Sequence, residues 1–569
     1  MKLPYFRHLW VCATACATSF CAPTTQALAQ HHTPHLDTIA VITVNDFHAS
    51  FLPYPDQDIP GVGRLWATVD SLRHAYPSHV VVSAGDNFGG SYFSRKTHDA
   101  WLPWIMHKLG ITLSAIGNHE FDNGQTFLAD RWQSEPLRPK DWHLDYVCAN
   151  VTDSTGQRPH YMQGVVTRRV PLTGGDSLEI AFTGLVTATT PYQTSKKHIQ
   201  GLTFRGDYAQ VLRELHQEPK VRAAFARAPL HILNTHVATE MDEGEAEWTE
   251  DNDDEAFEGI SRLGYHAIIT GHSHFVVEGT IHALPVVQAE CYGKHVGLLT
   301  FVYNRTTGHV RALPARAVLV GSGDWAAAER DAMDAKMDSV LHATINDQGR
   351  SLGQRLTQSA DLLTHDRKNK RVISPLAGYI CRSYANAARA ALQLPPQEVV
   401  IGLSHTAGIR THLQKGIVRT IDAGQVLPFE NKVGVFYMPG YVLKALLAYG
   451  LNNRSYGWLQ SCDLSITANA HSTDEDHEDD SWPHYTIDKV IYTNGQQPHT
   501  IQDEHYYYVA ADNFMTLGGD SYPTEYFTPY RVNTDTPVTS EAFFRLLEQQ
   551  ASISEAQAPQ SHVVIHRHD

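Results

Sequence analysis

The clearest indication of the fold comes from residues 38–48, which read Thr-Ile-Ala-Val-Ile-Thr-Val-Asn-Asp-Phe-His. The first seven residues are apolar or β-branched, which is typical of a short buried strand. Asp46 and His48 follow two positions apart, and side chains at that spacing share a face in an extended segment. The stretch therefore predicts a strand that ends in two potential metal ligands.

The same arrangement recurs along the N-terminal half of the chain. β-rich runs are expected near residues 79–83, 113–116, 178–182, 230–234 and 266–270, separated by helical or loop segments, and this alternation indicates an α/β architecture. Polar motifs follow four of these runs: Gly85-Asp86, Gly117-Asn118-His119-Glu120-Phe121-Asp122, Asn234-Thr235-His236 and Gly271-His272-Ser273-His274. Loops at the carboxyl ends of strands are where α/β folds build their sites.

These motifs contain more ligand groups than one tetrahedral ion needs. Carboxylates, an amide oxygen and imidazoles suit divalent ions such as Mn²⁺ or Zn²⁺, and a shared carboxylate can bridge two of them. The candidate metal ligands are Asp46, His48, Asp86, Asn118, His236, His272 and His274. We therefore expect a site for two divalent metal ions.

The composition excludes several other classes of protein. The 569 residues include 61 acidic and 45 basic ones, giving a formal charge of -16, so binding of nucleic acid through a basic face is not expected. The chain is 42% hydrophobic, which excludes a disordered or collagen-like protein. Its 34 histidines favour metal binding.

The N-terminus has the features of a leader. Residues 1–29 combine Lys2 and Arg7 with an apolar stretch and an Ala27-Leu28-Ala29 cleavage motif, which predicts a signal peptide and a periplasmic or secreted protein. Lipoprotein anchoring through Cys21 is the less favoured alternative, because Phe20 is a poor residue before a lipidated cysteine. The sequence leaves open the disulfide state of the remaining cysteines, Cys148, Cys291, Cys381 and Cys462, and the oligomeric state.

The chain divides into two expected domains. Residues 30–322 hold the metal motifs, a solvated helix over about 325–345 lies in a linker at 323–352, and residues 353–569 form a second α/β domain with a helix at 376–392 and strands at 399–403 and 506–510. The acidic stretches 240–258 and 474–480 are expected to be solvated loops. We expect hinge motion around the linker.

The second domain offers groups suited to a phosphorylated aromatic ligand. Arginine forks match phosphate oxygens, and paired phenylalanines can sandwich a base. The candidate substrate-binding residues are Arg367, Arg371, Arg410, Phe429, Asn431, Phe514 and Asp520. From these residues alone, a buried core role for each phenylalanine and a solvated charge run for Arg367 and Arg371 stay open.

The order of the motifs resembles a known family. D-x-H, G-D, G-N-H-E, an isolated His and G-H-S-H are similar to the calcineurin-like metallophosphoesterase superfamily, in its 5'-nucleotidase branch. D-R-x-x-x-R, G-I-R, P-F-x-N and N-F-x-x-x-G-G-D are similar to the C-terminal domain of bacterial periplasmic 5'-nucleotidase/UDP-sugar hydrolases. The resemblance covers residues 37 to 550. It implies a four-layer α/β/β/α sandwich joined by a linker helix to an α/β nucleotide-binding domain.

The resemblance also implies roles for the candidate residues. One ion would be held by Asp46, His48, Asp86 and His274, and the other by Asp86, Asn118, His236 and His272. His119, oriented by Asp122, would contact the scissile phosphate, while Arg367, Arg371 and Arg410 would grip the substrate's oxygens. Phe429 and Phe514 would stack on the base, Asn431 would bond to the base, and Asp520 would bond to the ribose.

The implied function is release of phosphate from nucleoside 5'-monophosphates by water activated between two ions, with UDP-sugars or nucleoside di- and triphosphates as further substrates. A 2',3'-cyclic-nucleotide 2'-phosphodiesterase/3'-nucleotidase is the nearest alternative, and Asp122-Asn123 favours the 5' activity over it. A non-catalytic exported nucleotide-binding protein is the alternative from another class. The sequence departs from the family pattern at Ala49 and at His405-Thr406-Ala407, where glycines are usual.

Overall fold

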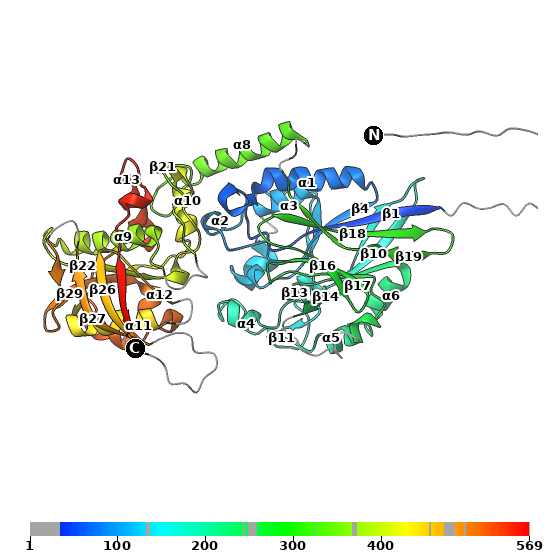
Figure 1. Ribbon diagram of the computed structural model, residues 1–569. Coiled ribbons are helices and arrows are strands. Elements are labelled where there is room, and N and C mark those ends of the chain that lie inside the picture. The colour runs from blue at the N-terminus through cyan, green and yellow to red at the C-terminus, as the bar shows by residue number, and fades with distance from the viewer. Residues whose placement is uncertain are drawn as a thin grey trace, which may run out of the picture.

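The structure of the protein is a computed structural model, which describes residues 35–131, 137–242, 245–248, 259–321, 323, 325–366, 372–453, 457–471, 484–493 and 497–567. The described chain forms two α/β domains that lie side by side, with the long helix α8 between them (Figure 1). The predicted leader, residues 1–29, lies outside the described residues.

The N-terminal domain contains two sheets. The first has the strand order β19-β18-β1-β4-β5-β6-β8, with β20 also paired to β18. Its strands are β1 (Leu36–Val44), β4 (His79–Ser83), β5 (Ile111–Ala115), β6 (Asp145–Val147), β8 (Met162–Gln163), β18 (His295–Asn304), β19 (His309–Ala312) and β20 (Arg316–Leu319). β1, β4, β5, β6 and β8 are parallel to their neighbours along this series, so their carboxyl ends meet at one edge.

The second sheet has the order β16-β17-β15-β12-β10-β9. Its strands are β9 (Val166–Pro171), β10 (Ser177–Thr183), β12 (Leu230–Asn234), β15 (Ala267–Ile269), β16 (Val276–Ile281) and β17 (Leu284–Ala289). β10, β12, β15 and β17 are parallel, so this sheet also gathers its loops at one edge.

The two sheets pack face to face through alternate residues of their strands. Ile39 and Val41 of β1 join Phe182 and Ile232 of the second sheet in one buried cluster. Ala40 and Ile42 point the other way, as the two-residue period of a strand requires, and pack among helix side chains. Helices α1 (Gly61–Ala75) and α3 (Leu102–Leu109) cover the first sheet, and α5 (Tyr208–Leu215) and α6 (Pro219–Arg227) cover the second. The predicted four-layer sandwich is confirmed.

Short elements connect these layers. They are β2 (Pro53–Tyr54), β3 (Ile59–Pro60), α2 (Tyr92–Thr97), β7 (Val151–Thr152), α4 (Thr190–Gln193), β11 (Thr203–Phe204), β13 (Thr239–Asp242) and β14 (Glu245–Trp248), with helical turns at Pro55–Gln57, His119–Phe121 and Phe127–Arg131.

The C-terminal domain is also built on two larger sheets. One has the order β24-β29-β22-β25 and the other β28-β27-β26-β30, while β21 pairs with β23. The strands are β21 (Arg355–Ser359), β22 (Val400–His405), β23 (Gly416–Arg419), β24 (Val433–Pro439), β25 (Leu459–Ser461), β26 (Leu464–His471), β27 (His484–Tyr492), β28 (His499–Thr500), β29 (Tyr506–Asp512) and β30 (His562–Arg567).

Helices cover both faces of the β22-containing sheet. Val400 and Ala510 face α9 (Pro375–Leu392) and α13 (Thr539–Glu548), while Ile401 and Val509 face α11 (Gly440–Asn452). The remaining helices are α10 (Thr420–Val426) and α12 (Asn513–Thr516), with helical turns at Thr406–Gly408, Gly519–Ser521, Thr524–Tyr526, Thr528–Tyr530 and Glu555–Gln557. This domain has the predicted mixed α/β character.

Two sequence expectations differ from the structure. The helix expected to be solvated, α8 (Ala327–Ala343), buries Met333, Met337, Val340 and Leu341, because one of its faces packs against α1. The first part of the acidic stretch 240–258 forms the β13–β14 hairpin rather than a loop. Met241 and Ala246 pair across this hairpin and pack over Gly279 of β16, which leaves Glu240 and Glu247 for solvent. Residues 474–480 lie outside the described residues.

The four cysteines left open by the sequence are all buried free thiols. Among the described residues, no helix has both the length and the apolar character that crossing a membrane requires.

Candidate metal centre and substrate site

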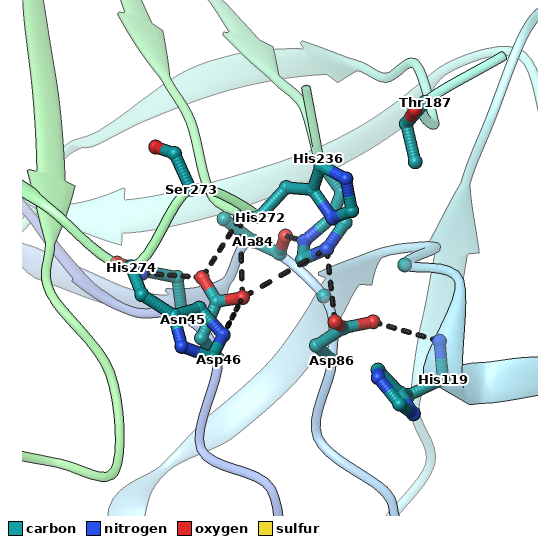
Figure 2. Close-up of polar contacts among 12 residues, drawn as sticks. Asn45, Asp46, Ala84, Asp86, His119, Thr187, His236, His272, Ser273 and His274 are labelled. Carbon is teal, nitrogen blue, oxygen red and sulfur yellow. Dashed lines mark hydrogen bonds and ion pairs between the residues drawn. The ribbon is translucent and has the colours of Figure 1, made fainter. Parts of the chain in front are cut away.

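The predicted metal ligands lie at the edge where the parallel strands of both sheets end. Asp46 and His48 follow β1, Asp86 follows β4, Asn118 follows β5, His236 follows β12, and His272 and His274 follow β15. Figure 2 shows Asp46 and Asp86, which follow strands of the first sheet, close to His236, His272 and His274, which follow strands of the second. The structure therefore brings together side chains that are separated by more than 200 positions in the sequence.

The first group consists of Asp46, His48 and His274. The Nε2 atoms of His48 and His274 are 3.0 Å apart, and His274 Nε2 is 3.3 Å from Asp46 Oδ1. Ligands about 2.1 Å from one tetrahedral ion are separated by roughly 3.4 Å, so these three atoms have the spacing of ligands around a common ion. Asn45 donates to Asp46 Oδ2 at 2.7 Å and holds this carboxylate in place.

The second group consists of Asp86, His236 and His272. His236 Nε2 lies 3.1 Å from Asp86 Oδ2, and its Nδ1 donates to the carbonyl of Ala84 at 2.8 Å. A metal-ligating histidine is commonly oriented by such a bond from its other nitrogen. Asp86 Oδ2 is also 3.9 Å from His48 Nε2 of the first group, so Asp86 lies between the two groups.

Asn118 provides a further test of whether metal fits here. Its Oδ1 is buried and makes no hydrogen bond to any described residue. A buried polar atom without a partner costs free energy, which a coordinated cation would recover. An amide oxygen, two carboxylates and four imidazoles form a donor set suited to divalent ions, so these residues fit the implied metal pair.

The backbone at this edge is strained. Asp46, His48, Asp86, His272 and His274 all have positive φ angles, between 48° and 82°. Such residues cost of order 1–3 kcal/mol each and gather at functional sites, where the surrounding structure enforces them. Ala49 also has a positive φ of 49°, so it adopts the conformation that glycine would reach without strain.

Two glycines of the motifs are required by the crowding of these groups. A Cβ atom at Gly117 would lie 2.1 Å from Asp86 Oδ1, and one at Gly271 would lie 2.7 Å from His236 Nδ1. Both contacts are shorter than real Cβ atoms allow, so any side chain at either position would displace a metal-site group.

The charges in this site are strongly coupled. Burial raises the pKa of Asp86, but the neighbouring His236 and His119 outweigh burial and hold this pKa well below its ordinary value. Burial lowers the pKa of His48 to about 3, which leaves this imidazole neutral and able to ligate. Burial also opposes protonation of His236, but Asp86 and Asp46 raise its pKa to about 10.

His119 and Asp122 form the predicted dyad. His119 Nδ1 donates to Asp122 Oδ2 at 2.8 Å, and its backbone N–H donates to Asp86 Oδ1 at 2.9 Å. Burial lowers the pKa of His119, while Asp86 and Asp122 overcome burial and raise it to about 9. The bond through Nδ1 directs Nε2 away from Asp122, as an orienting carboxylate does in other dyads.

Glu120 is a functional residue that the sequence reasoning did not single out. Its buried carboxylate accepts from the backbone N–H groups of Asp86 at 2.8 Å, Asn87 at 2.9 Å and Gly117 at 2.6 Å, and from Asn87 Nδ2 at 3.0 Å. It therefore ties the loop that carries Asp86 to the loop that carries Asn118 and His119. Burial raises its pKa to about 7. The only signal in the sequence is the acid within Gly-Asn-His-Glu.

A cavity of about 250 Å³ opens beside these residues and extends between the domains. His48, His119, His274 and Tyr292 line it from the N-terminal domain, and Arg410, Thr411, His412 and Gln425 line it from the C-terminal domain. The predicted phosphate-gripping Arg410 thus shares a cavity with the predicted catalytic histidine. Tyr292 was not anticipated, and no sequence motif marks it.

The other predicted substrate residues fall into two clusters in the C-terminal domain. Phe429 and Asn431 line a small pocket with Gly408 and Asp512. Phe514 and Asp520 lie around the buried His405. Arg367 and Arg371 lie outside the described residues.

The ring of Phe429 is already in contact with two cations. The guanidinium carbons of Arg95 and Arg410 lie 5.4 and 5.5 Å from its centroid. Arg95 belongs to α2 of the N-terminal domain, and its neighbour Lys96 is 2.7 Å from Glu430 Oε1. Where a guanidinium covers a face of the Phe429 ring, it must move before a base can stack on that face.

Comparison with known proteins agrees with this arrangement. The family model for calcineurin-like phosphoesterases matches residues 39–276, and the model for the 5'-nucleotidase C-terminal domain matches residues 355–525. The first match defines a metallophosphoesterase. Together the two matches span more than half of the chain, which belongs to the two-domain 5'-nucleotidase family of calcineurin-like phosphoesterases.

Similar proteins differ in how much of their length matches. Endonuclease YhcR of Bacillus subtilis is 24% identical over 76% of this chain, but the match covers 35% of YhcR, so the chain spans about a third of that relative. The 5'-nucleotidase of Diplobatis ommata is 22% identical over 85% of this chain and 83% of its own. The crystal structure of a 5'-nucleotidase precursor from Thermus thermophilus matches with a TM-score of 0.59 and 22% identity, covering 93% of this chain and 99% of the other.

Proposed function

We propose that this protein releases phosphate from nucleoside 5'-monophosphates with the help of two divalent metal ions. The observation that carries the proposal is that His48 and His274 of the first ligand group, His119 of the dyad and Arg410 of the other domain all line one interdomain cavity. The second ligand group adjoins the first, because its Asp86 Oδ2 lies 3.9 Å from His48 Nε2. Phosphate at the metal groups and a nucleoside in the C-terminal domain would then be held by the two domains together. The names of the Diplobatis and Thermus proteins support the nucleotidase activity.

The first ion would be held by Asp46, His48, Asp86 and His274, and the second by Asp86, Asn118, His236 and His272. When bound, such ions neutralise phosphate oxygens and lower the pKa of water towards about 7. Zn²⁺ and Mn²⁺ both suit this donor set, so metal analysis of the purified protein decides between them.

The chain's own groups complete the chemistry. His119, fixed by Asp122, is proposed to hydrogen-bond to the phosphate oxygens as charge develops, or to protonate the departing ribose oxygen. Arg410 is proposed to bind oxygens of the substrate from the other side of the cavity. Phe429 and Phe514 are proposed to stack on the base, with Arg367, Arg371, Asn431 and Asp520 as the remaining contacts.

A substrate panel tests the proposal. The purified protein is assayed for phosphate release from AMP, UDP-glucose and 2',3'-cyclic AMP, with Mn²⁺, with Zn²⁺ and with chelator. We expect metal-dependent release from AMP, and UDP-glucose tests the additional substrate class. Phosphate release from the cyclic nucleotide alone would favour the 2'-phosphodiesterase/3'-nucleotidase function instead. Absence of phosphate release from all three compounds would favour a non-catalytic nucleotide-binding protein.

We propose in addition that the protein is exported and that residues 1–29 are removed. The charged, apolar and small-residue segments of this stretch support the proposal. Mass spectrometry of the protein recovered from outside the cytoplasm should find an N-terminus near Gln30, and an intact Met1 in that fraction would contradict cleavage. The domain boundaries at 322 and 352 also stay proposals.

A further inference from the structure

His405 occupies a position where the chain departs from the pattern of its family. It ends β22, and its side chain is buried. Its position matters because β22 lies beside β29. The segment 512–520, which begins at the last residue of β29, carries two proposed nucleoside-binding residues, Phe514 and Asp520.

His405 contacts this segment at its beginning, middle and end. Its Nε2 lies 3.5 Å from Oδ2 of Asp512, whose Oδ1 caps α12 by accepting from Met515 N. Its ring stacks on Phe514 with centroids 5.7 Å apart and planes inclined by 22°. Its Nδ1 lies 2.7 Å from Oδ2 of Asp520.

The surrounding residues leave room for this ring and for little else. A Cβ atom at Gly408 would lie 2.9 Å from His405 Nε2, and one at Gly519 would lie 2.4 Å from the ring of Phe514. Asp520 itself has a positive φ of 47°, a conformation that costs free energy and needs support from its neighbours. The ion pair with His405 provides such support.

The two proposed ligand groups each keep a surface for a ligand. Phe514 rests on His405 and is nevertheless 46% exposed, so part of its surface stays open for stacking. The pair with His405 engages Oδ2 of Asp520, and Oδ1 is the second acceptor of the same carboxylate. Burial lowers the pKa of His405, but Asp512 and Asp520 raise it above its ordinary value against the opposing charge of Arg410.

We propose that His405 is a positioning residue that holds Phe514 and Asp520 in the geometry that binds the base and ribose of the substrate. This inference rests on the proposed function, because it takes Phe514 and Asp520 as nucleoside contacts. His405 itself does not touch the nucleoside, since its ring is covered by the groups it holds. Its removal therefore weakens nucleoside binding and leaves the phosphate-binding and metal-binding groups unchanged.

His405→Phe tests the inference, because it keeps an aromatic ring under Phe514 and removes the ion pair to Asp520. Binding of adenosine, which has no phosphate, is measured by calorimetry. KM is measured for AMP and for 2-glycerophosphate, which has no base. Once Asp520 loses its ion pair with His405, we expect the adenosine Kd to rise about 10-fold, and the ratio of the KM for AMP to that for 2-glycerophosphate to rise by the same factor.

Two further variants separate positioning from general damage. If His405 acts through Asp520, the His405→Phe change has less than about a 2-fold effect on adenosine binding in an Asp520→Asn background. His471→Phe is the matched control, because His471 is an exposed histidine of β26 that bonds to Thr486. If His405→Phe does not fold, His405→Gln replaces it, since glutamine keeps a donor towards Asp520 and removes the ring.

An unchanged adenosine Kd in His405→Phe would overturn the inference, as would fully additive effects of His405→Phe and Asp520→Asn. These outcomes differ from failure of the proposed function. A wild-type protein that binds adenosine but releases no phosphate from AMP refutes the nucleotidase and still allows the binding test. A wild-type protein that hydrolyses 2-glycerophosphate and does not bind adenosine refutes the nucleoside site and this inference together.

Discussion

Replacing Glu120 by Gln should destabilise the N-terminal domain strongly, although the two side chains have nearly the same shape. All four groups that face the carboxylate are donors, two on Oε1 and two on Oε2. A glutamine amide in either orientation therefore turns its NH₂ group towards two N–H donors and accepts from only the other two. Two buried hydrogen bonds to a charged group are lost, at about 1.5–3 kcal/mol each.

The predicted loss is thus about 3–6 kcal/mol, which corresponds to a fall in Tm of roughly 6 °C or more for a domain of this size. Thermal unfolding is followed by near-ultraviolet circular dichroism at pH 8 in the presence of chelator, so that metal binding does not contribute. Glu218→Gln is the control, because Glu218 is 41% exposed and pairs with Arg158 at 2.7 Å. A Glu120→Gln protein within about 1 kcal/mol of wild type would refute the reasoning.

Three further predictions concern the dyad, the domain interface and acid stability. His119→Ala should keep its metal content but lose about 10²–10⁴-fold in kcat for AMP, and unchanged kcat would contradict its assigned role. Lys96→Met removes a buried ammonium that is 2.5 Å from Asp347 of the linker and 2.7 Å from Glu430 of the C-terminal domain. Small-angle scattering should therefore show a larger radius of gyration, whereas a scattering curve identical to that of the wild type would contradict the role of these contacts. Hydrogen bonds from Arg305 lower the pKa of the buried Asp37 to about 2. The ionised carboxylate of Asp37 therefore contributes its full stabilisation of the fold above about pH 4, and this contribution is lost as the pH falls towards 2. The loss in free energy of unfolding caused by Asp37→Asn should fall from about 2 kcal/mol at pH 6 to about 1 kcal/mol at pH 3. A loss that does not change with pH would contradict the link between the pKa of Asp37 and stability.

The candidate metal ligands could be predicted because each lies in a short motif, and these motifs recur at the ends of successive strands. Asp46, Asp86, His236 and His272 each follow a short apolar strand, and parallel strands bring such positions to a common edge. A family resemblance added the order of the motifs and the role of His119. The strands and the α/β class were predicted from short β-branched runs that alternate with helical or loop segments, whereas the four-layer sandwich was implied by the family resemblance.

The contacts that complete the site could not be predicted in this way. Glu120 is visible in the sequence, but three of its four donors come from a loop more than 30 positions away, whose conformation depends on strained residues such as Asp86. His405 was visible only as a departure from a pattern, because its partner Asp520 is distant in the sequence. The solvated appearance of α8 was misleading, since its apolar residues are few but lie on one face.

Diffraction at the Mn or Zn absorption edge, on crystals grown with the metal, tests the account most directly. The account predicts two anomalous peaks, one within the Asp46–His48–His274 group and one within the Asp86–His236–His272 group, with Asp86 contacting both ions and Asn118 Oδ1 contacting the second. A single peak outside these groups, or no peak with the side chains directed apart, would contradict it.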